Sequence, residues 1–183
     1  TAGEQLPNLY EFKRNYLTSL KSEEGARGTV GMPLALGMYE LLPLWHAVFT
    51  KLGFNVKVSP MSTRRIYEKG QFSIPSDTAC YPAKIMHGHI ETLITDGVDA
   101  IFYPCLTYNM DEKMTDNHYN CPVVAYYSEL LNGNVEELKR VKFLYPYLNI
   151  NSKKELAKEL YTYLGKFYNG ITKSEVKAAV EYG

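Results

Sequence analysis

The sequence predicts an α/β fold: a three-layer, mostly parallel, doubly wound (Rossmann-like) sheet with flanking helices. Short apolar segments typical of buried strands alternate with longer segments of helical periodicity. Strands that are joined through helices form parallel sheets with right-handed crossovers. The length of 183 residues suits one well-cored domain rather than two.

The chain divides at residue 29 into an N-terminal helix with its linker, residues 1–28, and a single α/β domain, residues 29–183. Within the first part, residues 6–21 are amphipathic. One face of this helix is expected to carry Leu9, Phe12, Tyr16 and Leu20. The chain begins with Thr rather than Met, and we expect it to be a fragment of a longer protein.

Five strands are predicted from short apolar or β-branched runs, at residues 29–32, 55–59, 99–103, 122–127 and 143–145. Helices are predicted between and after them, at residues 38–52, 62–69, 80–96, 134–140, 152–168 and 172–182. Ser62 is the expected N-cap of the second of these helices. Pro82 stands near the start of the third, where proline is tolerated, and Gly97 ends it.

Cys80 and Cys105 are predicted to meet at the carboxyl edge of the sheet. Helix 80–96 runs back antiparallel to the strands, so its first residue lies at that edge, where doubly wound sheets bind ligands. Cys105 directly follows the strand at 99–103. A helix N-terminus stabilises a thiolate, the form that metals bind. Buried thiols that only pack are the alternative interpretation.

Cys121 is predicted at the opposite edge, because it precedes the expected strand at 122–127, on the order of 15 Å long. It is kept as a third candidate metal ligand. Three cysteines cannot pair completely, so a disulfide framework is not expected. Candidate substrate-binding residues at the carboxyl edge are Pro33, Ser59, Ser76, Asp77 and Lys84.

Charge and missing motifs exclude several functions. Twenty basic residues balance twenty acidic ones, so nothing electrostatic favours nucleic acid or an anionic membrane as partner. No apolar run approaches the roughly 20 residues of a spanning helix. The phosphate loop, the dinucleotide fingerprint and the nucleophile elbow are absent from the sequence. His87 and His89 point about 200° apart on a helix, which indicates packed histidines rather than ligands of one metal ion.

Three stretches resemble a known family: GMPLALGMYELLPLWHAVFTKLGFNVKVS, PSDTACYPAKIMHGHIETLITDGVDAIFYPC and NCPVVAYY. With the opening NLYEFKRNYL, they are similar to the uncharacterised domain in large activators of (R)-2-hydroxyglutaryl-CoA dehydratase, the CoA-substrate-specific enzyme activases. The resemblance covers residues 8–150 and extends to the dehydratase subunits themselves.

The resemblance implies a function. Such activators use ATP hydrolysis to drive a low-potential electron into a dehydratase, where a ketyl radical allows water to leave. It further implies an iron–sulfur cluster on Cys80 and Cys105, with Cys121 inside a family motif. The implied partners are the ATPase domain of the parent protein, a 2-hydroxyacyl-CoA dehydratase and an acyl-CoA, in the cytoplasm of an anaerobe. The ATPase domain is absent from this sequence, so no complete catalytic or cluster site is expected in this chain alone.

Two hypotheses follow. In the first, the domain is an electron-transfer module that supplies Cys80 and Cys105 to an iron–sulfur cluster. In the second, it is a non-catalytic domain that docks on the dehydratase or holds a CoA ester. The second predicts cysteines buried in packing and a crevice lined by Pro33, Ser59, Ser76 and Tyr103.

Overall fold

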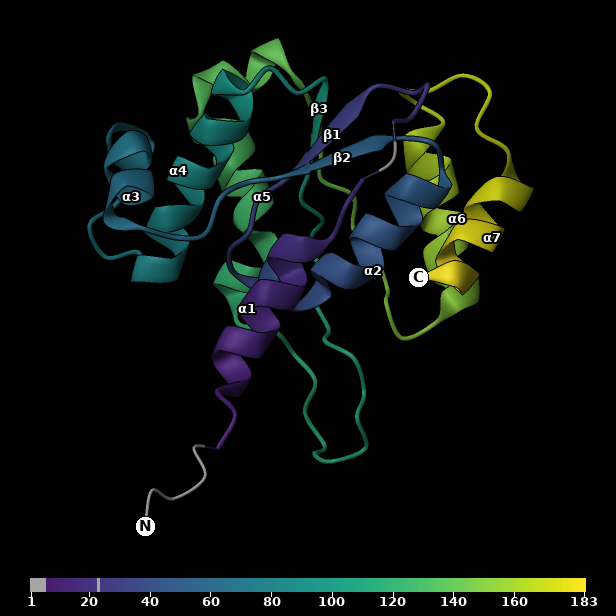
Figure 1. The fold of residues 1–183 in the computed structure, drawn as a ribbon, viewed down its shortest axis with the longest axis horizontal. Coiled ribbons are helices and arrows are strands. Elements are labelled where there is room, and N and C mark those ends of the chain that lie inside the picture. The colour runs from purple at the N-terminus through teal and green to yellow at the C-terminus, as the bar shows by residue number, and fades with distance from the viewer. Residues whose placement is uncertain (1–5, 23) are drawn as a thin grey trace.

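The fold was analysed in a computed structural model that describes residues 6–22 and 24–183. Residues 1–5 and 23 of the predicted N-terminal segment lie outside the described residues. The described chain forms a parallel four-stranded sheet in the order β2-β1-β3-β4 (Figure 1). Its strands are β1 (Thr29–Met32), β2 (Asn55–Val58), β3 (Ala100–Phe102) and β4 (Lys142–Leu144). The predicted α/β, Rossmann-like class is therefore confirmed.

Helices cover both faces of the sheet (Figure 1). On one face, α2 (Gly37–Lys51) packs Trp45 against Phe102 of β3, with ring centroids 5.0 Å apart. Beside α2 lie α7 (Lys173–Tyr182) and its neighbour α6 (Lys153–Leu164). On the other face, α4 (Tyr81–Thr95) presses Leu93 against Gly31 of β1. The short helix α3 (Arg64–Gly70), continued by the 3₁₀ turn η1 (Gln71–Ser73), packs outside α4.

The expected cap of α3 moves by one residue, from Ser62 to Thr63. The Thr63 side chain accepts from the Ile66 N–H at 3.3 Å, the usual role of an N-cap. Ser62 is engaged elsewhere, because its hydroxyl lies 2.9 Å from Nε2 of His89. The helix therefore begins at Arg64.

The predicted strand at 122–127 is wrong: these residues begin helix α5 (Pro122–Asn134). Pro122 occupies the first turn, and the helix buries Ala125, Ser128 and Leu131 on one side. The physical reason is the parallel pairing of β3 with β4, which requires a crossover between them. The predicted helix at 134–140 shortens to a 3₁₀ turn, η2 (Glu136–Arg140), and the strand predicted at 143–145 is β4.

The predicted N-terminal helix forms as α1 (Leu9–Ser19). Leu9 and Phe12 of its apolar stripe are 72% and 70% exposed, whereas Leu17 is buried. It projects from the sheet layers (Figure 1) and is held to α2 by an ion pair from Lys13 to Glu40. Its apolar stripe indicates a helix correctly, but no element of the described chain covers that stripe.

Two glycines let α3 and α4 approach to backbone contact. A Cβ added to Gly88 would lie 1.7 Å from the carbonyl oxygen of Ile66. A Cβ added to Gly70 would lie 2.1 Å from the backbone nitrogen of Gly88. Only glycine fits such contacts, so these residues fix how closely the two helices pack.

We expect Gly88→Ala to lower the free energy of unfolding by about 2–3 kcal/mol, because the added methyl group forces the two backbones apart. Urea denaturation measures the change. The matched control is Gly133→Ala in α5, where a Cβ would meet nothing within 4 Å in the described chain. In this control the free energy of unfolding should rise by about 0.5–1 kcal/mol. Equal effects of the two substitutions would contradict the close approach.

Candidate functional site

The site lies at the carboxyl ends of the central strands β1 and β3, where the order in which strands are added to the sheet reverses. β1 pairs with β2 on one side and with β3 on the other, so the chain leaves the carboxyl ends of these central strands toward opposite edges. Such a switch point opens a crevice for ligands in doubly wound sheets. Here the segments that follow the strands are Pro33–Leu34 after β1 and Tyr103–Pro104–Cys105 after β3.

Cys105 is fixed by strand-like pairing that continues beyond β3. Its N–H donates to the Pro146 carbonyl at 2.8 Å, and its carbonyl accepts from the Leu148 N–H at 3.2 Å. The side chain is 1% exposed, with Sγ 2.9 Å from Oγ of Ser128 on α5. Burial raises the pKa of the Cys105 thiol, and the Ser128 hydrogen bond only partly opposes this effect. The thiol is therefore protonated at neutral pH.

Cys80 and Cys121 occupy the N-caps of α4 and α5, and both are exposed. Both helices lead back toward the start of a parallel strand, so both N-caps lie at the carboxyl edge (Figure 1). The predicted position of Cys121 at the opposite edge is therefore wrong, because the segment that follows it is a helix. Asn120 draws Cys121 toward the chain after Cys105, by donating to the carbonyls of Leu106 and Thr107, each at 2.9 Å.

Tyr127 connects the cysteine-bearing edge with α4. Its hydroxyl lies 3.0 Å from Nε2 of His87, whose Nδ1 lies 2.9 Å from the hydroxyl of Ser73. Burial raises the pKa of Tyr127 to about 12, with the neighbouring Cys80 as the second cause. The tyrosine is therefore a neutral, hydrogen-bonded group near Cys80.

Tyr103 is the exception among the buried polar groups of the site. It is 2% exposed, and its hydroxyl has no hydrogen-bond partner in the described part of the chain. It stands two residues before Cys105 in extended chain, so both side chains point to the same face of the sheet. Burial first, and then the proximity of Cys105 and Tyr127, raises the pKa of Tyr103 far above its ordinary value. A neutral O–H donor thus lies next to Cys105 without an acceptor.

Two of the predicted substrate-binding residues are internal. Pro33 is buried, and Ser59 is 3% exposed. The Ser59 hydroxyl accepts from the Leu34 N–H at 2.8 Å and lies 2.7 Å from Nδ1 of His89. These contacts tie the turn after β1 to α4, so Ser59 has a structural position inside the fold.

The other three lie together beside Cys80. Ser76 and Asp77 are exposed in the turn before α4. The Lys84 ammonium donates to the Asp77 carbonyl at 2.7 Å and so holds this turn against the first turns of the helix. The structure thus brings Ser76, Asp77 and Lys84 to one rim, and their role in substrate binding stays a prediction.

Sequence reasoning missed Ser128 and Tyr127, because it assigned the start of their helix to a strand. Both project from α5: Ser128 contacts Cys105, and Tyr127 contacts His87. The spacing of three residues from Ala125 to Ser128 and from Ser128 to Leu131, and of four from Tyr127 to Leu131, was the available signal of a buried helical face.

The prediction that His87 and His89 are packed histidines is confirmed. Both nitrogens of each ring have partners: Ser73 and Tyr127 for His87, and Ser59 and Ser62 for His89. Burial lowers the pKa of each histidine to about 4. The pair is neutral and fastens α4 to its neighbours.

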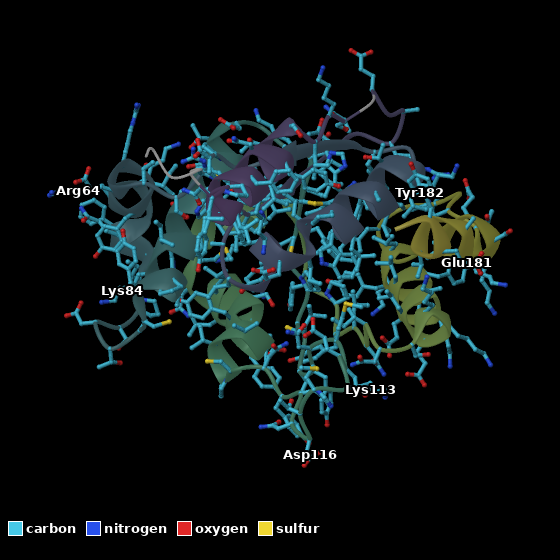
Figure 2. All side chains as sticks on the ribbon, turned by 60° about the horizontal axis from the view of Figure 1, so that its bottom comes forward. Arg64, Lys84, Lys113, Asp116, Glu181 and Tyr182 are labelled. Atoms are coloured by element: carbon cyan, nitrogen blue, oxygen red, sulfur yellow. The ribbon has the colours of Figure 1, made fainter. Side chains whose placement is uncertain are left out.

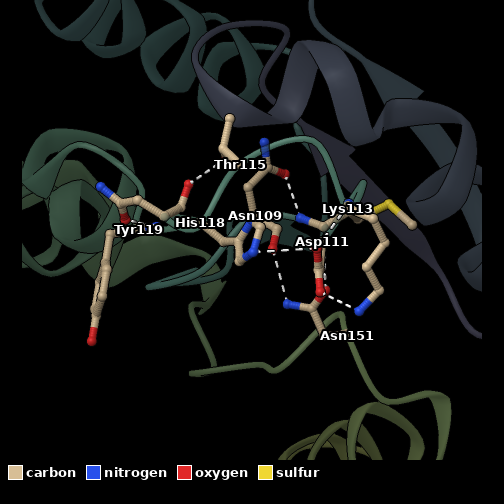
Figure 3. Close-up of polar contacts among 9 residues, drawn as sticks. Asn109, Asp111, Lys113, Thr115, His118, Tyr119 and Asn151 are labelled. Carbon is tan, nitrogen blue, oxygen red and sulfur yellow. Dashed lines mark hydrogen bonds and ion pairs between the residues drawn. The ribbon is translucent and has the colours of Figure 1, made fainter.

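The loop between Cys105 and Cys121 extends beyond the sheet (Figure 1). Figure 3 shows the polar contacts that join it to Asn151, just before α6. Asp111 donates its N–H to Oδ1 of Asn151 at 2.8 Å, and Asn151 donates to the Asn109 carbonyl at 2.9 Å. His118 pairs with Asp111 across the loop at 3.2 Å. Hydrogen bonds from Lys113 hold the pKa of Asp111 below its usual range. These contacts therefore give the loop a defined shape between Cys105 and Cys121.

The three cysteines share one edge without forming a ready-made metal cage. Among residues 6–22 and 24–183, no three His, Cys, Asp or Glu side chains are grouped as a metal-binding set. Cys105 is turned onto Ser128, whereas Cys80 and Cys121 open to solvent. A metal centre at this edge would require the Cys105 thiol to leave Ser128 and lose its proton.

Residues 29–183 match a family model described as the CoA enzyme activase uncharacterised domain. No curated protein and no solved structure matches the chain. Each helix of the described residues is too short or too polar to cross a membrane.

We expect stability to fall in acid because of the two buried histidines. With a pKa of about 4 in the folded chain and an ordinary value of 6.5, each ring binds a proton first in the unfolded state. The contribution of each histidine to the free energy of unfolding is therefore fully present above about pH 6.5. It is lost as the pH falls toward 4, by on the order of 3 kcal/mol per histidine.

Urea denaturation between pH 7 and pH 4 measures this loss. The His87→Gln variant should show a shallower pH dependence than the wild type. Gly133→Ala changes no titratable group and should keep the wild-type dependence. A wild-type stability that is flat over this range would contradict buried neutral rings.

We expect Tyr103→Phe and Tyr127→Phe to change stability in opposite directions in the metal-free chain. The first removes a buried hydroxyl without a partner and should raise the free energy of unfolding by about 1 kcal/mol. The second removes the partner of His87 and should lower it by about 1–2 kcal/mol. Thermal and urea unfolding compare the pair, and equal losses would show that the Tyr103 hydroxyl is satisfied in solution.

Proposed function

The chain belongs to the family of the CoA enzyme activase uncharacterised domain, and from this premise we propose that it is the electron-transfer module of a dehydratase activator. In this proposal Cys80, Cys105 and Cys121 hold an iron–sulfur cluster at the carboxyl edge of the sheet. The module serves the ATP-driven radical dehydration of a 2-hydroxyacyl-CoA.

One observation carries the proposal: three cysteines from separate segments meet at one sheet edge. Two of them begin helices, and the third follows the central strand β3. Thiolates are the usual ligands of iron–sulfur clusters. Thiols that served packing alone would have no reason to share this edge, and two of the three are exposed rather than packed.

The donor set suits a cluster in its chemistry, and Tyr103 supports this fit. A buried hydroxyl without a partner costs about 1–3 kcal/mol, so its retention favours an acceptor that is bound in the crevice. Sulfide and thiolate sulfurs accept hydrogen bonds from neighbouring groups, and such bonds help to set cluster potentials. Tyr103 stands beside Cys105, where such an acceptor would lie.

Each residue then has a defined task. When bound, an iron–sulfur cluster transfers single electrons. Cys105, as a thiolate turned away from Ser128, would hold the cluster together with Cys80 and Cys121 from the two helix N-caps. The Tyr103 hydroxyl would donate a hydrogen bond to a sulfur acceptor, and Tyr127, held by His87, would exclude water from the side of α4.

Three cysteines leave one position of a four-coordinate site to another donor. Family membership suggests a parent ATPase domain and a partner dehydratase. We propose that the remaining ligand comes from one of these or from the bound substrate, on the open side of the edge where Cys80 and Cys121 are exposed.

A docking or CoA-ester-binding role is the second candidate, and one observation favours it. Large side chains are exposed around the same edge: Phe72 is 92% exposed, Met114 82% and Tyr119 65%. Side chains of this kind are enriched at protein interfaces. In this alternative the edge binds the dehydratase and the cysteines carry no metal.

Anaerobic reconstitution with iron and sulfide tests the proposal. We expect the wild-type chain to retain iron and sulfide in equal amounts and to show the visible charge-transfer absorption of thiolate-bound iron. Alanine at Cys80, Cys105 or Cys121 should remove most of the bound iron.

The matched control is Thr172→Ala, which removes the N-cap of α7, where Glu175 pairs with Arg27 ahead of β1, at the edge opposite to the cysteines. It should lose about 1 kcal/mol of stability and keep its iron. Retention of wild-type amounts of iron by the three cysteine variants would overturn the cluster and leave the docking role.

A further inference from the structure

A groove of about 460 Å³ lies between α6 and α7, away from the cysteine-bearing edge. Figure 2 shows Glu181, at one end of this groove, and Lys84, beside Cys80, on opposite sides of the molecule. Ala157 forms part of its floor. We call it the lysine groove, because five lysines line it: Lys153, Lys154, Lys158, Lys173 and Lys177.

The positive charge of the groove is largely uncompensated. Glu181 is the one acidic residue in its lining, and it pairs with Lys177 at 3.7 Å. Among the residues that the structure describes, Lys153, Lys154, Lys158 and Lys173 have no ion-pair partner. Elsewhere lysines do pair with acids, as Lys57 does with Asp96 at 3.1 Å.

The positions of three of these lysines on their helices also disfavour positive charge. Lys153 and Lys154 stand in the first turn of α6, and Lys173 is the first residue of α7. The N-terminus of a helix carries partial positive charge and disfavours cations. Three lysines thus stand where the helix dipoles repel them.

The acidic residues of the same first turns lie outside the lining of the groove and bond elsewhere. Glu155 of α6 accepts from the Asn149 amide at 2.7 Å. Glu175 of α7 pairs with Arg27 at 2.9 Å and caps its own helix through Thr172. Neither carboxylate therefore makes an ion pair with a lysine of the groove.

We propose that the lysine groove binds a small organic anion that carries at least two phosphate groups. Its volume lies in the range of small-molecule sites, and ammonium groups on flexible stems bind phosphate as point charges. Ala157 and the aliphatic stems of the lysines provide an apolar floor for the uncharged part of such a ligand. The concave shape and the confinement of the charge to one groove favour a small ligand over an extended polyanion.

Isothermal titration of the full chain at low ionic strength tests the site, with ADP, pyrophosphate and adenosine as probes. We expect ADP and pyrophosphate to bind, adenosine to show no binding, and affinity to fall as salt is added. Tighter binding of ADP than of pyrophosphate would identify a nucleotide-like ligand, and equal binding a free polyphosphate. Both results support the site.

The variant is Lys154→Ala/Lys158→Ala, which removes two charges on one side of the groove. Alanine favours helix, so this variant is expected to fold. Its dissociation constant for ADP should rise at least about tenfold, as the loss of two charge-assisted contacts implies.

The matched control is Lys21→Ala/Lys139→Ala, which removes equal charge outside the groove and should bind ADP as the wild type does. An equal loss in both double variants would show diffuse attraction to net charge and overturn the proposal. Absence of phosphate binding by the wild-type chain would overturn it as well. Neither outcome depends on the cysteines or on a cluster.

Discussion

The parallel pairing of β3 with β4 is the constraint on which the cysteine-bearing edge depends. Parallel neighbours cannot be joined by a tight turn, so the chain between them has to cross back over the sheet as a helix. That helix is α5, and its first turn therefore returns to the carboxyl edge with Cys121 at the N-cap. The same pairing continues past β3 to Cys105, where it holds the thiol against Ser128 of the crossover helix.

The sequence was sufficient to predict the class of fold, the first βα units and helix 80–96. The signals for these elements are local: apolar periodicity along the element and a glycine that ends the helix. It was not sufficient for residues 122–127, whose β-branched and aromatic side chains favour a strand locally. Only the non-local requirement for a crossover between β3 and β4 determines that this segment is helical. The stripe of α1 is a similar case, because periodicity predicts a helix but not the presence of a covering surface.

At the site, hydrogen bonding separates structural from functional polar groups in a way that sequence patterns cannot. The rings of His87 and His89 are buried with both nitrogens hydrogen-bonded. Their polar groups therefore hold α4 against its neighbours. Tyr103 is equally buried, but in the described chain its hydroxyl lacks an acceptor. The partners of these groups come from segments far apart in sequence. Residue type and spacing therefore predicted that Cys80 and Cys105 share the carboxyl edge, whereas only the geometry shows that the Tyr103 hydroxyl has no partner in the described chain.

The balanced composition and the lysine groove are compatible because charge acts over a limited range. Twenty basic and twenty acidic residues cancel over the whole chain, which argues against partners that sense an extended field, such as nucleic acid. At physiological ionic strength a charge is screened over roughly 8 Å, so a small anion responds only to its immediate neighbours. Five lysines around one groove can therefore hold such an anion in a chain without net charge. The distribution of charge over α6 and α7, rather than its sum, determines what this face can bind.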